Sequence, residues 1–274
     1  LWEETDRVTN LVLMNEDSTV VENRVLTTAE IQNAAATFEG LDMGVPYIAQ
    51  IFYNEVLRGT LNTKTSGSSG SLIFNINIPG ITAEDISTAL AGHAAEGTKK
   101  VTVNFASGME FNMEGTITIP TGIQDISFVG SENANGKLSQ LNKVYFAIES
   151  EVNDVNFEYL SMNSDGGFMF QVGAQKFHDI TFEGCEVKQV NSAVRLHSGA
   201  EGNSVNFNNC WVSNTGGWSF LNVGSGCTIP AINVTNSTLT EFNTRIADIR
   251  VKTDIKFKNV TLVNIAEDDS PLVT

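Results

Sequence analysis

The sequence predicts an all-β protein whose larger part is a parallel β-helix, in which successive coils of strand stack on one another. Three observations predict this class. A motif of eight residues recurs about every 25 residues through the second half of the chain. Asn occurs 28 times and Gly 23 times, and both residue types favour turns over helices. Only 18% of the 274 residues are charged, so amides and hydroxyls supply most of the polarity.

The charge balance excludes several classes of partner. Asp and Glu number 32 against 16 Lys and Arg, which gives a net charge of −16. Nucleic acids and anionic lipid surfaces are bound mainly through Lys and Arg, so neither is an expected partner. No apolar run reaches the roughly 18 residues that a membrane-spanning helix needs. We therefore expect a secreted or cell-surface protein, extracellular and monomeric, without a membrane-spanning segment.

The first 65 residues form a separate small domain in this interpretation. Short apolar or alternating segments separated by turn residues are typical of a small β-sandwich. These segments are Asn10–Leu13, Thr19–Val21, Ala36–Phe38 and Tyr47–Phe52. A Ser/Gly segment, 66–71, follows and has the composition of a flexible linker. Residues 72–274 then form the second domain.

The stretch FEGLDMGVPYIAQIF, residues 38–52, resembles the signature of the fibronectin type III family. Leu41, Gly44 and Tyr47 fit the Leu, the turn Gly and the corner Tyr of that family. Trp2 fits the core Trp of an early strand. Because only one residue precedes Trp2, the resemblance implies a partial module that lacks its first strand. It also implies a spacer role for this domain and no catalysis.

One helix is expected near residues 83–96, at the start of the second domain. Thr82 is a good N-cap, and Asp85 three positions later completes a capping box with Asp in place of Glu. The apolar residues that follow fall on one helix face. They are Ile86, Ala89, Leu90 and Ala94. We expect this helix to cap the N-terminal end of the β-helix, where an open coil would expose its core and edge.

The eight-residue motif predicts a strand, a bend and a second strand in each coil. Its copies are VNFEYLSM (155–162), ITFEGCEV (180–187), VNFNNCWV (205–212), INVTNSTL (232–239) and IKFKNVTL (255–262). The third position is Phe in four copies and Val234 in the other, and Phe128 is an earlier member of this column. The fifth position is Gly or Asn in four copies, and these residues accept a left-handed backbone, so a sharp bend belongs there. Such copies bury their apolar positions only when stacked, here in about six or seven coils.

The three cysteines fit this stacking better than a redox or zinc role. Their odd number prevents complete intramolecular pairing, and neither a CxxC pair nor a Cys/His spacing occurs. Cys185 and Cys210 occupy the sixth position of consecutive copies, and Ser237 and Val260 follow in the next two. We expect these four residues to form an inward column with buried free thiols.

A single-stranded parallel β-helix of such coils resembles the pectate-lyase-like superfamily, whose members wind in a right-handed sense. Together with the fibronectin type III-like module, the chain resembles uncharacterised surface lipoproteins of gut bacteria. The resemblance implies an association with polysaccharides. For the lyases it also implies calcium held by clustered Asp and Glu beside an Arg or Lys base. The outward columns of the motif are mixed, with no acid that repeats through all the coils, so that activity is not carried over.

No cofactor and no metal site are predicted. Asn163–Gly167 has the oxygen-rich composition that calcium accepts. It lacks the spaced acids and the terminal Glu of an EF-hand loop, so an ordinary turn is expected.

The richest group of polar side chains lies on the strand that follows each copy of the motif. These strands are FMFQV (168–172), VRLHS (194–198), SFLNV (219–223) and ADIRV (247–251). They align if the inward column is Phe170, Leu196, Leu221 and Ile249. The outward columns are then Met169, Arg195, Phe220 and Asp248, followed by Gln171, His197, Asn222 and Arg250. Guanidinium groups and amides suit sugar hydroxyls and carboxylates, and Trp211 and Trp218 offer apolar platforms for sugar rings.

The sequence leaves three functions open. The first is glycan binding by a candidate face made of Gln171, Arg195, His197, Trp211, Trp218, Asn222, Asp248 and Arg250. The second is a polysaccharide lyase or glycoside hydrolase that acts on an acidic polysaccharide at the same face. The third is a structural stalk or adhesin without a small ligand. No Ser-His-Asp or Cys-His arrangement is found, so no catalytic residue is assigned.

Overall fold

A computed structural model describes residues 8–15, 18–38, 41, 46–64, 71–265 and 271–274. The chain divides into two compact units, Leu1–Gly70 and Ser71–Thr274. Trp2, Gly44 and residues 66–70 of the predicted linker lie outside the described residues. Neither helix in the described part of the chain has the length and apolarity needed to cross a lipid bilayer.

The first unit contains a four-stranded antiparallel sheet in the order β2-β1-β3-β4. Its strands are β1 (Asn10–Asn15), β2 (Val20–Val25), β3 (Pro46–Tyr53) and β4 (Val56–Lys64). Leu13, Tyr47 and Ala49 form a buried cluster on one face of the sheet, and Leu41 packs against it. Two of the residues that suggested the fibronectin type III resemblance therefore lie in one cluster. The resemblance and the two-sheet sandwich remain predictions.

The structure differs from the sequence prediction at three places in this unit, and one of them is the strand β4, which was not among the predicted segments. Residues 36–38 form a loop and no strand, and their apolar side chains pack against the buried residues of the sheet. Residues Thr28–Asn33 form a short helix, α1, that the pattern of strands did not predict. The Thr27 hydroxyl accepts a hydrogen bond from the Glu30 amide, and the Glu30 carboxylate accepts one from the Thr27 amide. This capping box defines α1, which has no buried apolar residue of its own.

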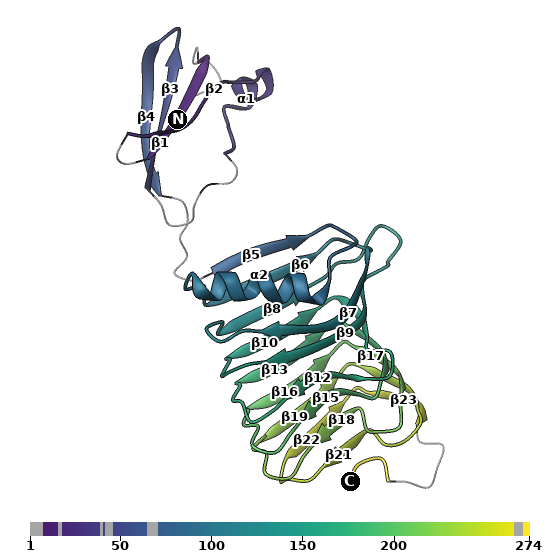
Figure 1. The fold of residues 1–274 in the computed structure, drawn as a ribbon. Coiled ribbons are helices and arrows are strands. Elements are labelled where there is room, and N and C mark those ends of the chain that lie inside the picture. Colours follow the sequence, from purple (N-terminus) through teal and green to yellow (C-terminus); the bar gives the residue numbers. More distant parts are fainter. Residues whose placement is uncertain (1–7, 16–17, 39–40, 42–45, 65–70, 266–270) are drawn as a thin grey trace. The chain divides into compact units, whose positions relative to one another are not determined.

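The second unit is a parallel β-solenoid, as predicted (Figure 1). Its first wall is an eight-stranded parallel sheet. The strands are β5 (Ser71–Ile76), β6 (Lys100–Phe105), β8 (Asp125–Val129), β10 (Asp154–Glu158), β13 (Asp179–Glu183), β16 (Ser204–Asn208), β19 (Ala231–Thr235) and β22 (Asp254–Lys258). The predicted number of coils, six or seven, was too low because β5 and β6 lie before the first copy of the recurring motif.

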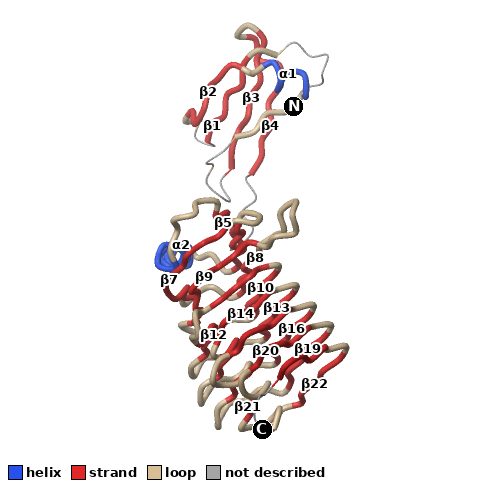
Figure 2. The backbone as a smooth tube through the Cα atoms, turned by 90° about the vertical axis from the view of Figure 1, so that its right-hand side faces the viewer, coloured by secondary structure: helices blue, strands red, loops and turns tan. Residues whose placement is uncertain are grey.

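The rest of each coil belongs to a second parallel sheet, which a corner divides into two walls. The second wall contains β7 (Glu110–Ile119), β9 (Ser139–Ile148), β11 (Leu160–Asn163), β14 (Glu186–Val190), β17 (Trp211–Thr215), β20 (Thr238–Phe242) and β23 (Thr261–Ile265). The third wall contains β12 (Phe168–Val172), β15 (Ser192–Leu196), β18 (Leu221–Val223) and β21 (Ala247–Ile249). The long strand β9 pairs with β11 through its first residues and with β12 through later ones, so it spans the corner between the two walls. Figure 2 shows the strands of successive coils stacked along the solenoid.

The motif has the predicted register and bend. Phe128, Phe157, Phe182, Phe207, Val234 and Phe257 are successive partners across the first wall. The rings of Phe182 and Phe207 stack at 4.4 Å with an angle of 2° between their planes. The bend residues have positive φ angles. They are Gly184, Asn209, Asn236 and Asn259, with Tyr159 in the remaining copy. Residue types that tolerate this conformation thus mark the first corner of the coil.

The predicted helix, α2 (Ala83–Ala95), begins at the N-cap Thr82, and both hydrogen bonds of the capping box with Asp85 are present. Ile86 and Leu90 are fully buried in the solenoid core. The Ser87 hydroxyl accepts a hydrogen bond from the Thr118 amide of β7 at 2.9 Å. The helix therefore covers an edge of the second sheet that would otherwise expose backbone donors.

The cysteine column is confirmed for three of its four predicted members, whereas the fourth, Val260, is only partly buried and packs against the core. Cys185, Cys210 and Cys227 are buried free thiols. Cys185, Cys210 and Ser237 are at most 3% exposed, and the Ser237 hydroxyl accepts a hydrogen bond from the Cys210 amide. Burial raises the pKa of the Cys210 thiol to about 12, so the thiol stays protonated. These cysteines serve packing.

Candidate functional site

The polar side chains predicted to form a site gather on the third wall. Gln171, Arg195, Asn222 and Asp248 are successive in-register partners on β12, β15, β18 and β21. His197 and Arg250 directly follow Leu196 and Ile249, the last residues of β15 and β21. Leu196 and Ile249 each pair with Val223 of β18, which lies between them. Six of the eight candidate residues therefore lie on one exposed wall.

The predicted columns were wrong in two respects. Met169 and Phe220 were expected to point outward but are fully buried. Two consecutive residues are buried at the start of each of these strands, Met169 and Phe170 at β12 and Phe220 and Leu221 at β18. The alternation of inward and outward side chains therefore fails next to the corner. Phe170 pairs with Val194 and not with Leu196. A shift of two residues leaves the inward and outward alternation unchanged, so alternation alone does not detect it.

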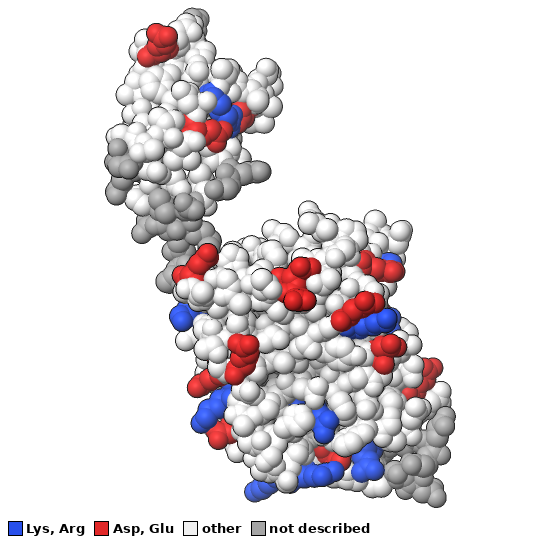
Figure 3. Space-filling model, in the orientation of Figure 1, with Lys and Arg blue, Asp and Glu red and all other residues white. Residues whose placement is uncertain are grey.

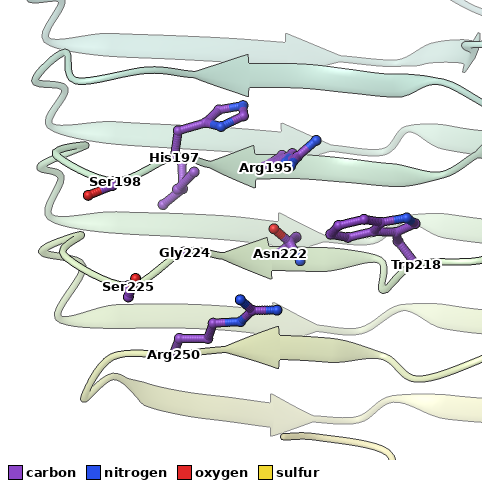
Figure 4. Close-up of a pocket in the computed structure, with 9 residues that line it drawn as sticks. Arg195, His197, Ser198, Trp218, Asn222, Gly224, Ser225 and Arg250 are labelled. Atoms are coloured by element: carbon purple, nitrogen blue, oxygen red, sulfur yellow. The ribbon is translucent and has the colours of Figure 1, made fainter.

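A hollow of about 220 Å³ lies over the last three strands of this wall (Figure 4). Its lining residues are Arg195, Leu196, His197, Ser198, Trp218, Asn222, Gly224, Ser225 and Arg250. Gly224 lies one coil from His197 and one coil from Arg250, and its missing side chain keeps the space between them open. A Cβ at this position would lie only 3.1 Å from the Leu196 carbonyl oxygen.

Arg195 carries a positive charge that no carboxylate of the described residues pairs with. Its guanidinium carbon lies 4.2 Å from the ring centre of Phe168 and 5.0 Å from that of Trp218. Aromatic faces attract a guanidinium without accepting its in-plane hydrogen bonds. The N–H donors of Arg195 therefore remain available to a ligand.

Arg250 differs, because Asp248 partly neutralises its charge. The guanidinium donates to both carboxylate oxygens of Asp248, at 3.1 and 3.4 Å. The Arg250 side chain is 60% exposed, so solvent screens this pair. Arg250 adds a directional donor at the far side of the hollow and contributes less charge than Arg195.

His197 is a neutral group at pH 7. Its Nε2 lies 3.2 Å from Oε1 of Gln171, and this oxygen only accepts hydrogen bonds, so Nε2 carries the ring proton. Burial and, to a smaller extent, the charge of Arg195 lower the pKa of His197 below its usual value. The other ring nitrogen, Nδ1, is then an acceptor.

Asn222 is the one described residue of the hollow that combines near-complete burial with an unpartnered polar side chain. It is 6% exposed, and its amide forms no hydrogen bond with the side chains or backbone of the described residues. In Figure 4 the amide lies between Arg195 and Arg250. The described side-chain polar atoms that are fully buried without a hydrogen-bond partner are Gln175 Oε1 and Thr215 Oγ1, so the amide of Asn222 is open to the hollow, where water or a ligand can complete its hydrogen bonds.

Trp211 is not part of the hollow. It lies on β17 of the second wall, is 49% exposed and has Lys188 within 6.0 Å of its ring centre. Trp218, in contrast, lines the hollow and is 42% exposed. The sequence did not distinguish the two because neither residue sits at a repeated position of the third wall.

Charge is unevenly distributed along the solenoid. Residues 71–186 contain 5 Lys and Arg against 15 Asp and Glu, whereas residues 187–265 contain 7 against 4. In Figure 3 the Lys and Arg side chains gather over the last coils. The hollow therefore lies in the basic part of an acidic protein.

Several residues escaped the sequence prediction. Phe168, Ser198, Gly224 and Ser225 were missed because each acts through its place beside another coil. An acidic column was also missed, in which Asp125, Asp154 and Asp179 are in register at the start of β8, β10 and β13. The sequence position just before each copy of the motif would have shown this acidic column.

No group of three or more His, Cys, Asp or Glu residues with metal-binding geometry occurs among the described residues. Residues 163–167 form a turn closed by a hydrogen bond from the Ser164 hydroxyl to the Gly167 carbonyl.

Comparison with protein-family models, with curated proteins and with solved structures finds no match to this chain. The function is therefore argued from the hollow itself. None of its lining residues is Asp or Glu, whereas glycoside hydrolysis requires a pair of carboxylates. The chemistry that the described residues offer is hydrogen-bond donation, positive charge and one aromatic ring.

Proposed function

We propose that the hollow binds an anionic glycan and that the protein works outside the cell or on its surface. The observation that carries the proposal is the juxtaposition of two groups in the hollow. Asn222 presents to the hollow an amide that forms no hydrogen bond with the described residues, and Arg195 presents a guanidinium that none of their carboxylates pairs with. A ligand with acceptor oxygens and negative charge satisfies both.

The anionic character of the ligand follows from the charges around the hollow. Arg195 and Arg250 lie on either side of Asn222, and no acid lines the space between them. Arg195 has no carboxylate partner among the described residues, whereas Asp248 partly neutralises Arg250, so the hollow keeps a net positive charge that favours carboxylate or sulfate oxygens, which accept paired N–H donors. A neutral ligand would leave the charge of Arg195 uncompensated.

The carbohydrate character follows from the mixture of groups. Trp218 exposes an aromatic surface on one side of the hollow, the amide of Asn222 lies near the middle, and Ser198 and Ser225 lie on the opposite side (Figure 4). Sugars combine apolar ring faces with many hydroxyls, so an aromatic platform flanked by donors and acceptors suits them. The resemblance of the repeat to pectate-lyase-like β-helices supports the same ligand class, although a fold alone does not determine function.

Affinity electrophoresis and calorimetry on a panel of acidic and neutral polysaccharides test the proposal. The wild-type protein is expected to be retarded by at least one acidic polysaccharide. Arg195→Ala is expected to weaken that binding about ten-fold or more, because it removes charged hydrogen bonds. Trp218→Ala is expected to weaken it as well.

The matched control is Arg58→Ala, which removes an exposed arginine from β4 of the first unit. Its affinity should equal that of the wild type. Unchanged migration of the wild-type protein on every polysaccharide would refute the proposal. Unsaturated uronate products in the incubation mixture would identify the site as a lyase centre and not a binding site.

A further inference from the structure

The guanidinium of Arg195 lies against two aromatic rings that contact each other, and only one of them belongs to the hollow. Trp218 lines the hollow, whereas Phe168 lies beside it on β12, one coil before Arg195. The ring centres of Phe168 and Trp218 are 5.5 Å apart, and their planes meet at 82°. Phe168 is the closer of the two to the guanidinium, at 4.2 Å.

The backbone fixes the Trp218 side of this arrangement. The Trp218 amide donates to the side-chain oxygen of Asn191 at 3.2 Å, and its carbonyl accepts a hydrogen bond from the Thr244 hydroxyl. Trp218 is therefore tied to the coil before it and to the coil after it. Phe168 is fixed by its place in β12, where its backbone pairs with Ser192.

The long arginine side chain loses much of its conformational freedom against these two rings. An aromatic ring attracts a guanidinium without accepting its conventional N–H hydrogen bonds, so this contact orients the donors and leaves them available to a ligand. Orienting them before the ligand arrives removes an entropic cost from binding. Arg250 has no such support and is instead held by the carboxylate of Asp248.

We propose that Phe168 is a positioning residue for the hollow: it holds the Arg195 guanidinium against Trp218 so that its N–H donors face the ligand. This inference rests on the proposed function. Phe168 does not line the hollow, so it acts through Arg195 and contributes no contact of its own to the ligand.

The test compares Phe168→Leu with Phe168→Tyr in the full chain. Leu keeps an apolar side chain but removes the ring, whereas Tyr keeps the ring. With an oligogalacturonate as the probe, Phe168→Leu is expected to bind about two- to five-fold more weakly, and Phe168→Tyr to bind like the wild type. In an Arg195→Ala background, Phe168→Leu should cause no further loss of affinity, since the group it positions is gone.

A second readout needs no ligand. The Nε–H resonance of Arg195 in a ¹⁵N NMR spectrum should be shifted by the aromatic ring currents, and this shift should shrink in Phe168→Leu and persist in Phe168→Tyr. A resonance and an affinity that both stay unchanged in Phe168→Leu would overturn the proposal, as would an equal loss in the Arg195→Ala background. If no acidic polysaccharide binds the wild type, the proposed function and the binding role of Phe168 fail together. The resonance then still shows whether Phe168 orients Arg195.

Discussion

His197 lies beside the positive charge of Arg195, and partial burial together with this charge governs its titration. Its pKa is lowered from the usual 6.5, first by burial and then by Arg195. An NMR titration of the imidazole is expected to give a pKa below 6.5, with a higher value in Arg195→Met because the repelling charge is gone. His197→Asn identifies the resonance among the three histidines of the chain.

The same shift has a defined sign for stability. The unfolded chain takes up the proton near pH 6.5, before the folded protein does, so His197 lowers stability as the pH falls below that value. Urea unfolding at pH 7 and at pH 5.5 should therefore show a smaller acid-induced loss in His197→Asn than in the wild type. An equal loss in both proteins, or a measured pKa above 6.5, would contradict this account.

At this scale the sequence predicted which side chains share a wall but not which of them touch. Arg195, Asn222 and Arg250 were assigned to the outward side correctly because alternation separates inside from outside. Their partners across the coils were not, because the register of neighbouring strands is fixed by backbone hydrogen bonds and corners. Phe168 was overlooked for the same reason: its role exists only when Arg195 of the next coil lies over it.

At the scale of the element, the phenylalanine column provides a comparison within one motif. Phe182 is fully buried and stacks on Phe157 and Phe207, whereas Phe257 on β22 is 38% exposed. Phe182→Ala is expected to lower the free energy of unfolding by about 3–5 kcal/mol, because it leaves a cavity in a packed column. Phe257→Ala should cost about 1 kcal/mol or less.

Urea denaturation followed by tryptophan fluorescence measures both variants. The two residues occupy the same position of the repeat, so a motif-based account without stacking predicts equal losses. Equal losses would show that position in the motif, and not burial between neighbouring coils, sets the contribution.

The elements that the sequence predicted correctly are those marked by a local motif or by the same residue type at the same position of successive coils. The capping box of Thr82 and Asp85 marks the start of α2, and Gly or Asn at the fifth position of four of the five motif copies marks the first corner. The second corner stayed hidden, although Gln189, Asn214, Glu241 and Asn264 all have positive φ there. These residue types differ from coil to coil, so no column is visible in the sequence. Stacking between coils imposes the conformation instead.

At the scale of the whole molecule, charge separates the two halves of the solenoid. A net charge of −10 over residues 71–186 gives way to +3 over residues 187–265, where the hollow lies. A local basic region within an acidic protein draws an anionic ligand toward one end and repels it from the rest. The excess of acid that argued against nucleic acid and membrane is therefore compatible with an anionic ligand at this site.

Lys252 tests whether this local field steers the ligand. It is exposed, follows Arg250 by two residues and does not line the hollow. Lys252→Glu is expected to lower the association rate constant for an acidic oligosaccharide several-fold at about 0.01 M salt and to leave the dissociation rate constant unchanged, because charges outside a contact act mainly on encounter. The difference should vanish near 0.5 M salt, where the Debye length falls to about 4 Å. The matched control is Lys137→Glu, an exposed lysine in the acidic half that pairs with Glu110, and it should change neither rate. A change confined to the dissociation rate constant would instead make Lys252 a direct contact, and equal effects of both variants would mean that total charge and not its location governs association.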